Sequence, residues 1–291
     1  MDMSRLGLVC ITTSDDVRYR TITRKRLLQH EPEAQQQLLA ELYQANLQRL
    51  AQALAYCRQE GITLYRMPSS LFPFSDEPVG RDVLERMADD VAAVGRQALA
   101  HDIRLVMHPD QFVVLSSDSS GVVANSIKIL DMHANIMDLL QQPRSPWAVL
   151  EIHGGKGGRS REMMERIGDL PDGIRLRLAL ENDEYAYGAE DILEICHATG
   201  VPMVFDAHHH VIKESLSSYE HPSVGEMLRR ARDTWPDPGM QLVHISNGRS
   251  AFNDRHHSDF IDAMPSSYAE APWIEIEAKL KEQAIRRLRQ R

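Results

Sequence analysis

The sequence predicts an α/β protein, a single-domain (β/α)8 TIM barrel that takes in residues 1–291. Short apolar segments rich in β-branched residues alternate with longer segments of helical periodicity, and this alternation occurs eight times along the chain. Eight β-then-α units in a chain of this length are typical of the barrel. A doubly wound parallel sheet is the alternative, and the lack of a long insertion between the units makes it the weaker prediction.

The expected strands and helices follow one another in strict alternation. Strands are expected at 5–11, 62–67, 103–108, 147–153, 174–181, 201–206, 240–245 and 272–277. Helices are expected at 35–59, 81–101, 121–142, 159–168, 189–199, 223–233, 257–264 and 279–290. Gly61 and Gly200 stand directly before the second and sixth strands, where a glycine is a typical helix stop. No linker, repeat or low-complexity segment marks a second domain.

The composition is that of an ordinary globular chain with a sizeable core. Hydrophobic residues make up 43% of it and charged residues 26%. The cysteines, Cys10, Cys57 and Cys196, lie far apart, which favours neither a disulfide framework nor a thiolate zinc site. No stretch approaches the roughly 18 apolar residues of a membrane helix, and the first residues lack the pattern of a signal peptide. We therefore expect a cytoplasmic protein with no membrane partner and no obligate protein partner.

Residue types that bind metal ions stand where six consecutive expected strands end. They are His108, Glu151 and His153, Glu181, Asp206 with His208, His209 and His210 after it, His244, and Glu277. In a TIM barrel these strand ends form one rim, which carries the active site. A single histidine or carboxylate there is more often a surface hydrogen-bonding group or a helix cap, but that explanation is poor for six strands in series. No role is assigned to the histidines on expected helices and remote loops, which are His30, His101, His133, His197 and His221.

The chemistry of these side chains points to divalent metal ions. Imidazole and carboxylate ligands without thiolate suit Zn²⁺, Mn²⁺ or Fe²⁺. The ligands outnumber what one ion needs, so two or three ions bridged by carboxylates are predicted. Clustered ions favour in-line displacement at a phosphate, because they stabilise both the attacking and the leaving oxygen. They also lower the pKa of bound water towards neutrality, which supplies hydroxide as a nucleophile.

A series of short strings is similar, in order, to one known family. The strings are RLGLVC, YRMPSSLFPF, MHPDQF, HGG, ALENDE, FDAHHH, VHIS, HHSDF and IEAK, and they extend over nearly the whole chain. Each string is weakly specific by itself, but the ordered set resembles the UV damage endonucleases, relatives of the endonuclease-IV-type barrels. The resemblance implies incision of double-stranded DNA immediately 5′ of a UV photoproduct, leaving a 3′-hydroxyl and a 5′-phosphate. It also implies a cluster of Mn²⁺ ions as cofactor, with Zn²⁺ or another divalent metal as the alternative.

Position by position, the resemblance implies a set of metal ligands. They are His108, His153, Glu181, Asp206, His209, His244, His257 and Glu277. The family pattern selects His209 from the triple histidine through an Asp-x-x-His spacing. It selects His257 over His256 through the string His-x-Asp-Phe.

Further residues are expected to act in catalysis and in lesion recognition. Glu181, Glu277 and Lys279 are the expected catalytic residues. Gln111 and Phe112 match a glutamine-aromatic pair that, in the family, enters the DNA helix at the lesion. An apolar side chain inserted between base steps offsets part of the cost of unstacking them. A packing residue at the barrel rim is the competing interpretation of Phe112.

Three positions depart from the family pattern. Ser70 stands where some relatives carry a histidine ligand, so a third ion would have fewer protein ligands. Leu8 stands where a lesion-contacting tyrosine often occurs, and Leu242 stands where a lysine is common two residues before the histidine. The range of lesions is therefore expected to differ from that of the best-known members.

The net charge of −9 argues mildly against a nucleic-acid partner, but the distribution of basic residues favours one. Five of them crowd the segment after the first strand and are expected to bind phosphate: Arg18, Arg20, Arg24, Lys25 and Arg26. Further cations follow the fourth, sixth and seventh strands, at Lys156, Arg159, Arg161, Lys213, Arg249 and Arg255. Loops after the strands lie on the catalytic face, so an acidic protein could still present a phosphate-binding rim. A solvated surface is the competing interpretation of the first cluster.

Two other functions stay open from the sequence. A metal-dependent sugar isomerase or epimerase uses the same barrel and similar ligands, and Glu277 with Lys279 could serve proton transfer there. The number of histidines, the Gln-Phe pair and the basic rim favour the nuclease. A module that binds damaged DNA without cutting it is disfavoured by the complete set of ligands.

Overall fold

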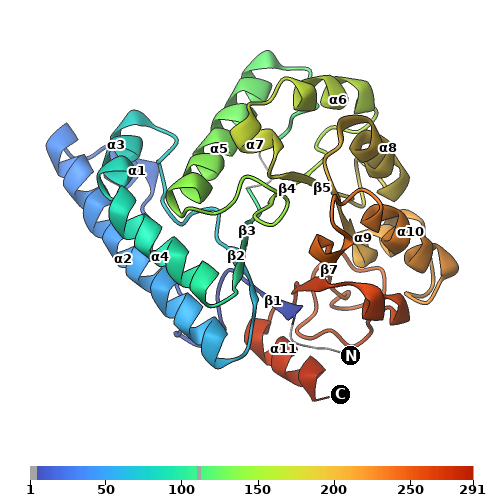
Figure 1. Ribbon diagram of the computed structural model, residues 1–291. Coiled ribbons are helices and arrows are strands. Elements are labelled where there is room, and N and C mark those ends of the chain that lie inside the picture. The colour runs from blue at the N-terminus through green and yellow to red at the C-terminus, as the bar shows by residue number, and fades with distance from the viewer. Residues whose placement is uncertain (1–4, 110–112, 291) are drawn as a thin grey trace.

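Eight parallel strands close into one barrel, as the sequence predicts. The structure is a computed structural model that describes residues 5–109 and 113–290. Each strand is hydrogen-bonded to its neighbours in chain order, and the eighth closes the barrel on the first (Figure 1). The strands are β1 Leu6–Val9, β2 Leu64–Met67, β3 Arg104–Met107, β4 Leu150–His153, β5 Leu178–Glu181, β6 Met203–Asp206, β7 Leu242–Ile245 and β8 Trp273–Ile276. Each strand lies within a segment that the sequence predicts to be one.

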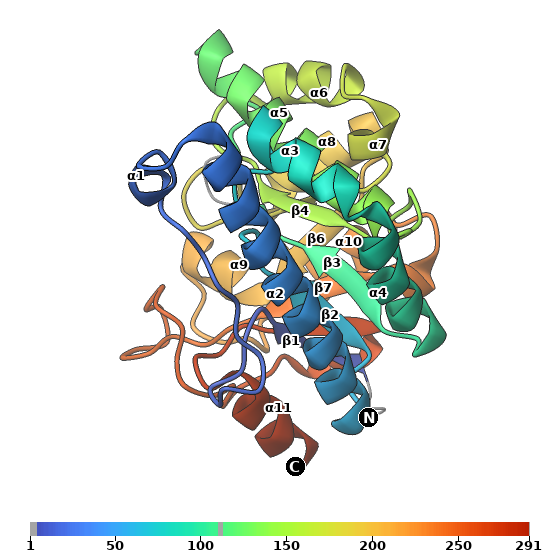
Figure 2. The same cartoon turned by 90° about the vertical axis from the view of Figure 1, so that its left-hand side faces the viewer.

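Helices surround the barrel and lead from one strand to the next (Figure 1, Figure 2). They are α1 Arg24–Leu27, α2 Pro32–Gln59, α3 Pro78–Arg86, α4 Ala88–Ala100, α5 Ser120–Leu139, α6 Ser160–Gly168, α7 Asp172–Arg175, α8 Ala189–Thr199, α9 Ala207–Lys213, α10 Pro222–Arg232 and α11 Lys281–Arg289, with 3-10 turns η2 Pro238–Met240 and η3 Ser266–Glu270. The helix expected at 81–101 is divided at Met87 into α3 and α4. Gly61 and Gly200 follow α2 and α8 with φ angles of 63° and 74°, in the left-handed region expected of such stops. Over the described ranges, none of the helices has the length and apolar character that a bilayer span requires.

The helix expected at 257–264 is not formed, and that prediction was wrong. The segment is irregular, and His257 takes part only in an isolated β-bridge. The side-chain oxygen of Asn247 accepts hydrogen bonds from the backbone N–H groups of Asp262 and Ala263, at 2.8 and 2.9 Å. These N–H groups therefore bond to a side chain instead of to a carbonyl one turn earlier, which is the usual competition between side chains and helix.

The interior of the barrel changes character along its axis. At the N-terminal ends of the strands, the guanidinium of Arg104 lies 5.3 to 5.7 Å from the ring centroids of Trp147, Trp235 and Trp273. An apolar layer of inward residues, including Val106, Val149, Val204 and Leu242, packs with these tryptophans. Towards the C-terminal ends the inward residues are charged, and buried Arg66, Glu151, Glu181, His244 and Glu275 lie there. The fold thus gathers its charged groups at the rim where the sequence predicts a metal site.

Candidate metal centre

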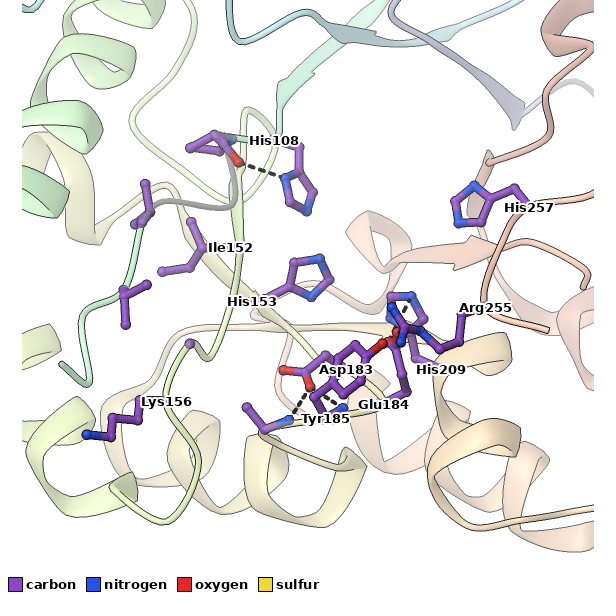
Figure 3. A pocket seen from close by; sticks show the side chains of 15 residues that line it. His108, Ile152, His153, Lys156, Asp183, Glu184, Tyr185, His209, Arg255 and His257 are labelled. Carbon is purple, nitrogen blue, oxygen red and sulfur yellow. Dashed lines mark hydrogen bonds and ion pairs between the residues drawn. The ribbon is translucent and has the colours of Figure 1, made fainter. Parts of the chain in front are cut away.

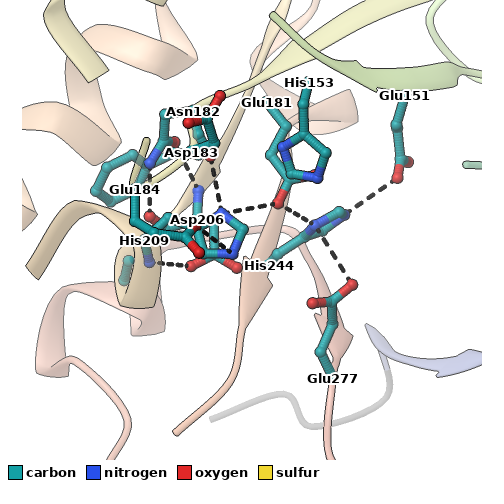
Figure 4. Close-up of polar contacts among 12 residues, drawn as sticks. Glu151, His153, Glu181, Asn182, Asp183, Glu184, Asp206, His209, His244 and Glu277 are labelled. Atoms are coloured by element: carbon teal, nitrogen blue, oxygen red, sulfur yellow. Dashed lines mark hydrogen bonds and ion pairs between the residues drawn. The ribbon is translucent and has the colours of Figure 1, made fainter. Parts of the chain in front are cut away.

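The carboxylate of Glu181, at the end of β5, lies among the imidazoles of His108, His153, His209 and His244, of which the last three are labelled in Figure 4. One of its oxygens is 3.2 Å from Nε2 of His108 and 3.5 Å from Nε2 of His153. The other oxygen is 3.0 Å from Nδ1 of His244 and 3.5 Å from Nδ1 of His209. The two oxygens of this carboxylate could each bind a cation. The nitrogen of His209 that faces Glu181 is Nδ1, whereas its Nε2 lies 3.7 Å from Glu184.

The register of the strands brings the other carboxylates to the same place. His153 stands opposite Glu181 in the β4–β5 pair, and Asp206 stands opposite His244 in the β6–β7 pair. Among the described residues, four groups of potential ligand atoms lie within 4.8 Å of one another, and three of them belong to this cluster: His108, His153 and Glu181; Glu181, Asp206 and His209; and Asp206, His244 and Glu277. Residues far apart in the sequence therefore form one cluster.

Asp206 ends β6 and also caps α9, so it serves both the helix and the cluster. Its Oδ1 accepts a hydrogen bond from the backbone N–H of His209 at 2.8 Å. Its Oδ2 is buried and has no hydrogen-bond partner among the described residues. A buried carboxylate oxygen without a partner is unfavourable. A divalent cation fits this position, because oxygen and imidazole nitrogen atoms surround it and a cation would satisfy the oxygen.

Of the three consecutive histidines on α9, the middle one faces the cluster. His208 is held by the hydroxyl of Tyr219 at 2.6 Å and by a backbone carbonyl at 2.9 Å. His210 lies 3.1 Å from the hydroxyl of Ser223. Successive helix residues point in directions about 100° apart, so one side chain of the three can reach the rim.

Backbone carbonyls orient two of the histidines. Nδ1 of His108 lies 2.9 Å from the carbonyl oxygen of Pro109, and Nδ1 of His209 lies 2.9 Å from that of Asn182. A carbonyl oxygen only accepts, so Nδ1 carries a proton in both rings. Nε2 is then the nitrogen left to bind a metal ion, which is the usual arrangement of a metal-binding histidine.

Glu277, just after β8, lies between an arginine and two histidines. One of its oxygens accepts a hydrogen bond from Nη2 of Arg66 at 2.5 Å and is 3.8 Å from Nδ1 of His244. Its other oxygen is 3.7 Å from Nε2 of His257. His256 instead pairs with a carboxylate of its own loop at 2.9 Å. The structure therefore brings His257, and not its neighbour, to Glu277.

Burial and charge act in opposite directions on the titrating groups of this cluster. Burial disfavours the charged form of His209, but the nearby carboxylates of Asp206 and Glu181 outweigh that effect and raise its pKa to about 9. Burial likewise disfavours the ionised carboxylate of Glu181, yet the imidazoles of His244 and His153 hold its pKa well below the usual range. The pKa of His153 is lowered, mainly by burial. The carboxylate of Glu181 is thus held in its ionised form, which attracts positive charge.

A cavity of about 590 Å³ opens above the cluster (Figure 3). Its lining includes His108, His153, His209 and His257 from the cluster, and Lys156 and Arg255 from the loops after β4 and β7. Arg255 pairs with Glu184 at 3.0 Å and lies 4.1 Å above the ring of Tyr185. Lys156 pairs with Asp118 at 2.7 Å, and Asp183 and Glu184 also line the cavity, so an anionic ligand would compete with these carboxylates for the cations at the rim.

Some expected site residues do not join the cluster. Lys279 is exposed at the start of the last segment of the chain. Gln111 and Phe112 lie outside the described residues. Their described neighbours Pro109 and Val113 line the cavity.

The basic segment after β1 is exposed and does not contribute to the described lining of the cavity. Arg18 and Arg24 each pair with one acidic side chain. Arg20, Lys25 and Arg26 have no ion-pair partner in the part of the chain that the structure describes. Their charge is therefore available to an external anion.

The sequence-based prediction missed two residues that the structure places beside the ligands. Arg66 lies inside the barrel, and Glu275 lies two residues before Glu277 on β8. Alternate strand residues share a face, so the spacing of the two glutamates was a signal for Glu275. A charged residue at an inward position of a strand was a signal for Arg66.

Fold and cluster together define a TIM-barrel enzyme whose reactive groups converge at the C-terminal ends of the strands. A sequence model of the family described as UV-endonuclease UvdE matches residues 4–291. The chain belongs to this UV-endonuclease family and is therefore an endonuclease.

Named relatives match nearly the whole chain. The UV DNA damage endonuclease of Nostoc sp. is 52% identical over 286 residues, which cover 98% of this chain and 89% of the relative. The UV DNA damage endonuclease of Deinococcus radiodurans is 48% identical over 288 residues, which cover 98% of this chain and 94% of the relative.

Solved structures share the fold. The crystal structure of SacUVDE has a TM-score of 0.77 at 23% identity and covers 98% of both chains. Endonuclease IV from Thermus thermophilus has a TM-score of 0.58 at 14% identity, over 98% of this chain and 96% of that one. D-psicose 3-epimerase from Clostridium cellulolyticum has a TM-score of 0.55 at 11% identity, over 97% and 89%. At such identities the likeness concerns the fold alone, so the epimerase adds no support for an isomerase.

Proposed function

We propose that this chain is a metal-dependent DNA repair endonuclease that incises the phosphodiester backbone immediately 5′ of UV photoproducts. The products are a 3′-hydroxyl and a 5′-phosphate. Membership of the UV-endonuclease family supports the class of reaction. The observation that carries the proposal is the carboxylate of Glu181, whose two oxygens lie 3.0 to 3.5 Å from four imidazole nitrogens. Such an arrangement suits clustered cations acting at a phosphate.

The proposed cofactor is a cluster of two or three Mn²⁺ ions, with Zn²⁺ or another divalent metal as the alternative. The ligands would be His108, His153, Glu181, Asp206, His209, His244, His257 and Glu277. The partnerless Oδ2 of Asp206 and a donor set of nitrogen and oxygen atoms support divalent ions of this kind. When bound, such ions supply hydroxide at neutral pH and neutralise charge that develops on the phosphate.

Other residues of the chain would orient the metal ligands and bind the DNA backbone. The carbonyls of Pro109 and Asn182 hold the imidazoles of His108 and His209 in one orientation. Lys156 and Arg255 at the cavity rim would contact phosphates, and the basic residues Arg18, Arg20, Arg24, Lys25 and Arg26 would extend that surface. Lys279, two residues after Glu277, is proposed to take part in proton transfer.

Gln111 and Phe112 are proposed to distinguish damaged from intact DNA. They follow His108 by three and four residues, next to two residues that line the cavity. A stacked aromatic contributes roughly 1–3 kcal/mol per base, so Phe112→Ala should weaken binding to a photoproduct duplex by about tenfold to a hundredfold. Metal content should not change, because phenylalanine offers no ligand atom. An equal loss of affinity for damaged and intact duplexes would show that Phe112 only packs at the rim.

The position of the cut tests the proposed reaction directly. A duplex with one cyclobutane dimer is labelled at the 5′ end of the damaged strand and incubated with the protein and Mn²⁺. The labelled product should end at the nucleotide 5′ of the dimer, and a DNA polymerase should extend it because it carries a 3′-hydroxyl. Cleavage on the 3′ side, or equal cleavage of the undamaged duplex, would contradict the proposal.

A further inference from the structure

Arg66 of β2 places one guanidinium among three carboxylates, on the inner side of the ligand cluster. Its Nη1 lies 2.7 Å from Glu275 and 4.0 Å from Glu151, and its Nη2 donates to Glu277 at 2.5 Å. The side chains of Glu151 and Glu275 are fully buried, and that of Arg66 is 10% exposed. A planar guanidinium that contacts carboxylates through two nitrogens has little orientational freedom. Arg66 therefore restrains the side chain of Glu277 from inside the barrel.

His244 joins this buried group to the ligand cluster (Figure 4). Its Nδ1 faces Glu181 and Glu277, at 3.0 and 3.8 Å. Its Nε2 lies 3.1 Å from Glu151 and 3.0 Å from Glu275. Nε2 can donate its proton to the carboxylate of Glu151, with Glu275 close by as an ion-pair partner, while Nδ1 stays available to a metal ion. Such a pairing of carboxylate and histidine commonly fixes the ring of a metal ligand.

The buried residues Glu151, His244 and Glu275 have the composition of a metal site of their own. Ligand atoms of Glu151, His244 and Glu275 lie within 4.8 Å of one another. However, the guanidinium of Arg66 already lies against Glu275 and supplies the positive charge that these carboxylates need. These residues thus form, with Arg66, a buried ion-pair network that is separate from the ligand cluster around Glu181.

We propose that Arg66 and Glu275 are positioning residues for the metal cluster, and that they hold Glu277 and His244 in the orientation in which both bind ions. The inference rests on the proposed function, because it concerns the ions which that function requires. Replacing a residue that hydrogen-bonds to a metal ligand typically lowers metal affinity or activity by about 10- to 100-fold. Arg66 and Glu275 should have effects of this size although neither is itself a proposed ligand.

Mn²⁺ binding to two variants tests the proposal without relying on activity. Arg66→Lys keeps the positive charge but cannot contact two carboxylates through two nitrogens of one planar group. A change in Mn²⁺ affinity therefore cannot be attributed to net charge. Glu275→Gln keeps the size of the side chain but weakens the acceptor for His244. Isothermal titration calorimetry should show Mn²⁺ affinity lowered by about 10- to 100-fold in both variants. Nicking should recover in part at saturating Mn²⁺, because the defect lies in holding the ions.

Arg104→Lys is the matched control. Arg104 is buried like Arg66, though more completely, at the opposite end of the barrel, where it donates to the backbone carbonyls of Pro146, Trp147 and Met240 at 2.7 to 2.9 Å. A change there should lower the melting temperature and leave Mn²⁺ affinity unchanged. The comparison separates loss of stability from loss of ligand orientation.

The outcomes are distinct. The proposal would be overturned if both variants bound Mn²⁺ with an affinity within about threefold of that of the unaltered protein. Such a change would be well below the loss of affinity that replacing a hydrogen-bond partner of a metal ligand typically causes. If Arg66→Lys does not fold, Glu275→Gln alone decides, and an unchanged affinity in that variant overturns it. An unaltered protein that binds Mn²⁺ but fails to cut irradiated DNA would instead refute the proposed function and leave the positioning roles standing.

Discussion

Glu181 differs from the histidines around it in the number of metal ions that one side chain can bind. A carboxylate has two oxygens and can bridge two ions, whereas a neutral imidazole ligates one. The two oxygens of Glu181 lie within 3.5 Å of four imidazole nitrogens, so Glu181 contacts four other proposed ligands. Residues at the edge of the cluster, such as His257, have fewer partners and are expected to matter less for ion content.

Glu181→Gln should abolish cleavage while the protein stays folded. The amide keeps the shape of the side chain but removes the negative charge, so the loss should exceed the roughly 10- to 100-fold typical of residues that only support a ligand. Nicking of irradiated plasmid and Mn²⁺ content measure the effect, and circular dichroism checks the fold. Near-normal nicking with normal Mn²⁺ content would remove Glu181 from the ligands.

His257 and His256 form a matched pair for a second prediction. His257 lies 3.7 Å from Glu277, whereas His256 is 71% exposed and pairs within its own loop. His257→Ala should lower Mn²⁺ content and cleavage, and His256→Ala should leave both unchanged, since exposed side chains away from such sites have small effects. Equal behaviour of the two variants would contradict the assignment of His257.

At the residue scale, the sequence predicts those ligands that stand at strand ends, because the barrel brings strand ends to one rim. His244 and Glu277 were found in this way. Arg66 was not, because its inward position on β2 signals only a buried charge, whereas its role comes from contacts with Glu151, Glu275 and Glu277 on or after other strands.

Among the elements, strands were predicted well and loop structure was not. Each strand has a short apolar pattern, and burial on both faces makes that pattern strong. Glycine helix stops precede two of the strands, at Gly61 and Gly200. The segment 257–264 has apolar residues at helical spacing, yet Asn247, near the start of the same connection after β7, accepts hydrogen bonds from its backbone. Such an interaction between distant residues is invisible to periodicity. It matters for function, because His257 reaches Glu277 from this irregular segment.

The basic segment around α1 yields a prediction about DNA affinity. Lys25→Gln with Arg26→Gln should weaken binding to damaged and intact duplex alike, because phosphate contacts carry no information about the lesion. The slope of log affinity against log salt should fall by up to about two, roughly one for each lost phosphate contact. Titrations at several salt concentrations measure it.

The control for that prediction lies on α11. Arg286→Gln with Arg287→Gln removes the same charge from a helix where both arginines pair with acidic residues, Glu60 and Asp262. The salt dependence of this variant should match that of the unaltered protein. If both double variants flatten the salt dependence equally, only net charge matters and the basic segment is not a phosphate site.

The two ends of the barrel differ in role: one contributes to the stability of the fold, and the other carries the candidate metal centre. One end is closed by Arg104 and three tryptophans, and the other carries the buried carboxylates and histidines. Gathering that many carboxylates in a protein interior is unfavourable unless positive charge compensates them. The eightfold alternation in the sequence predicts the barrel and its active rim, but not how the charges at that rim balance.

Removal of metal should therefore destabilise the whole protein. A ligand that binds only the folded state at 100 times its dissociation constant adds about 2.7 kcal/mol, which corresponds to a rise of several degrees in melting temperature. Melting curves after dialysis against a chelator, and again after addition of Mn²⁺ or Mg²⁺, measure the effect. A melting temperature that Mn²⁺ does not raise would contradict a metal cluster at this rim.

The central claim is that this barrel cuts UV-damaged DNA with the help of divalent ions at the Glu181 cluster. The most direct measurement is nicking of supercoiled plasmid, irradiated or untreated, with Mn²⁺ or with chelator. We expect the protein to convert irradiated plasmid to open circles in Mn²⁺, and untreated plasmid and chelated samples to stay supercoiled. Nicking that is independent of irradiation, or that persists in excess chelator, would contradict it.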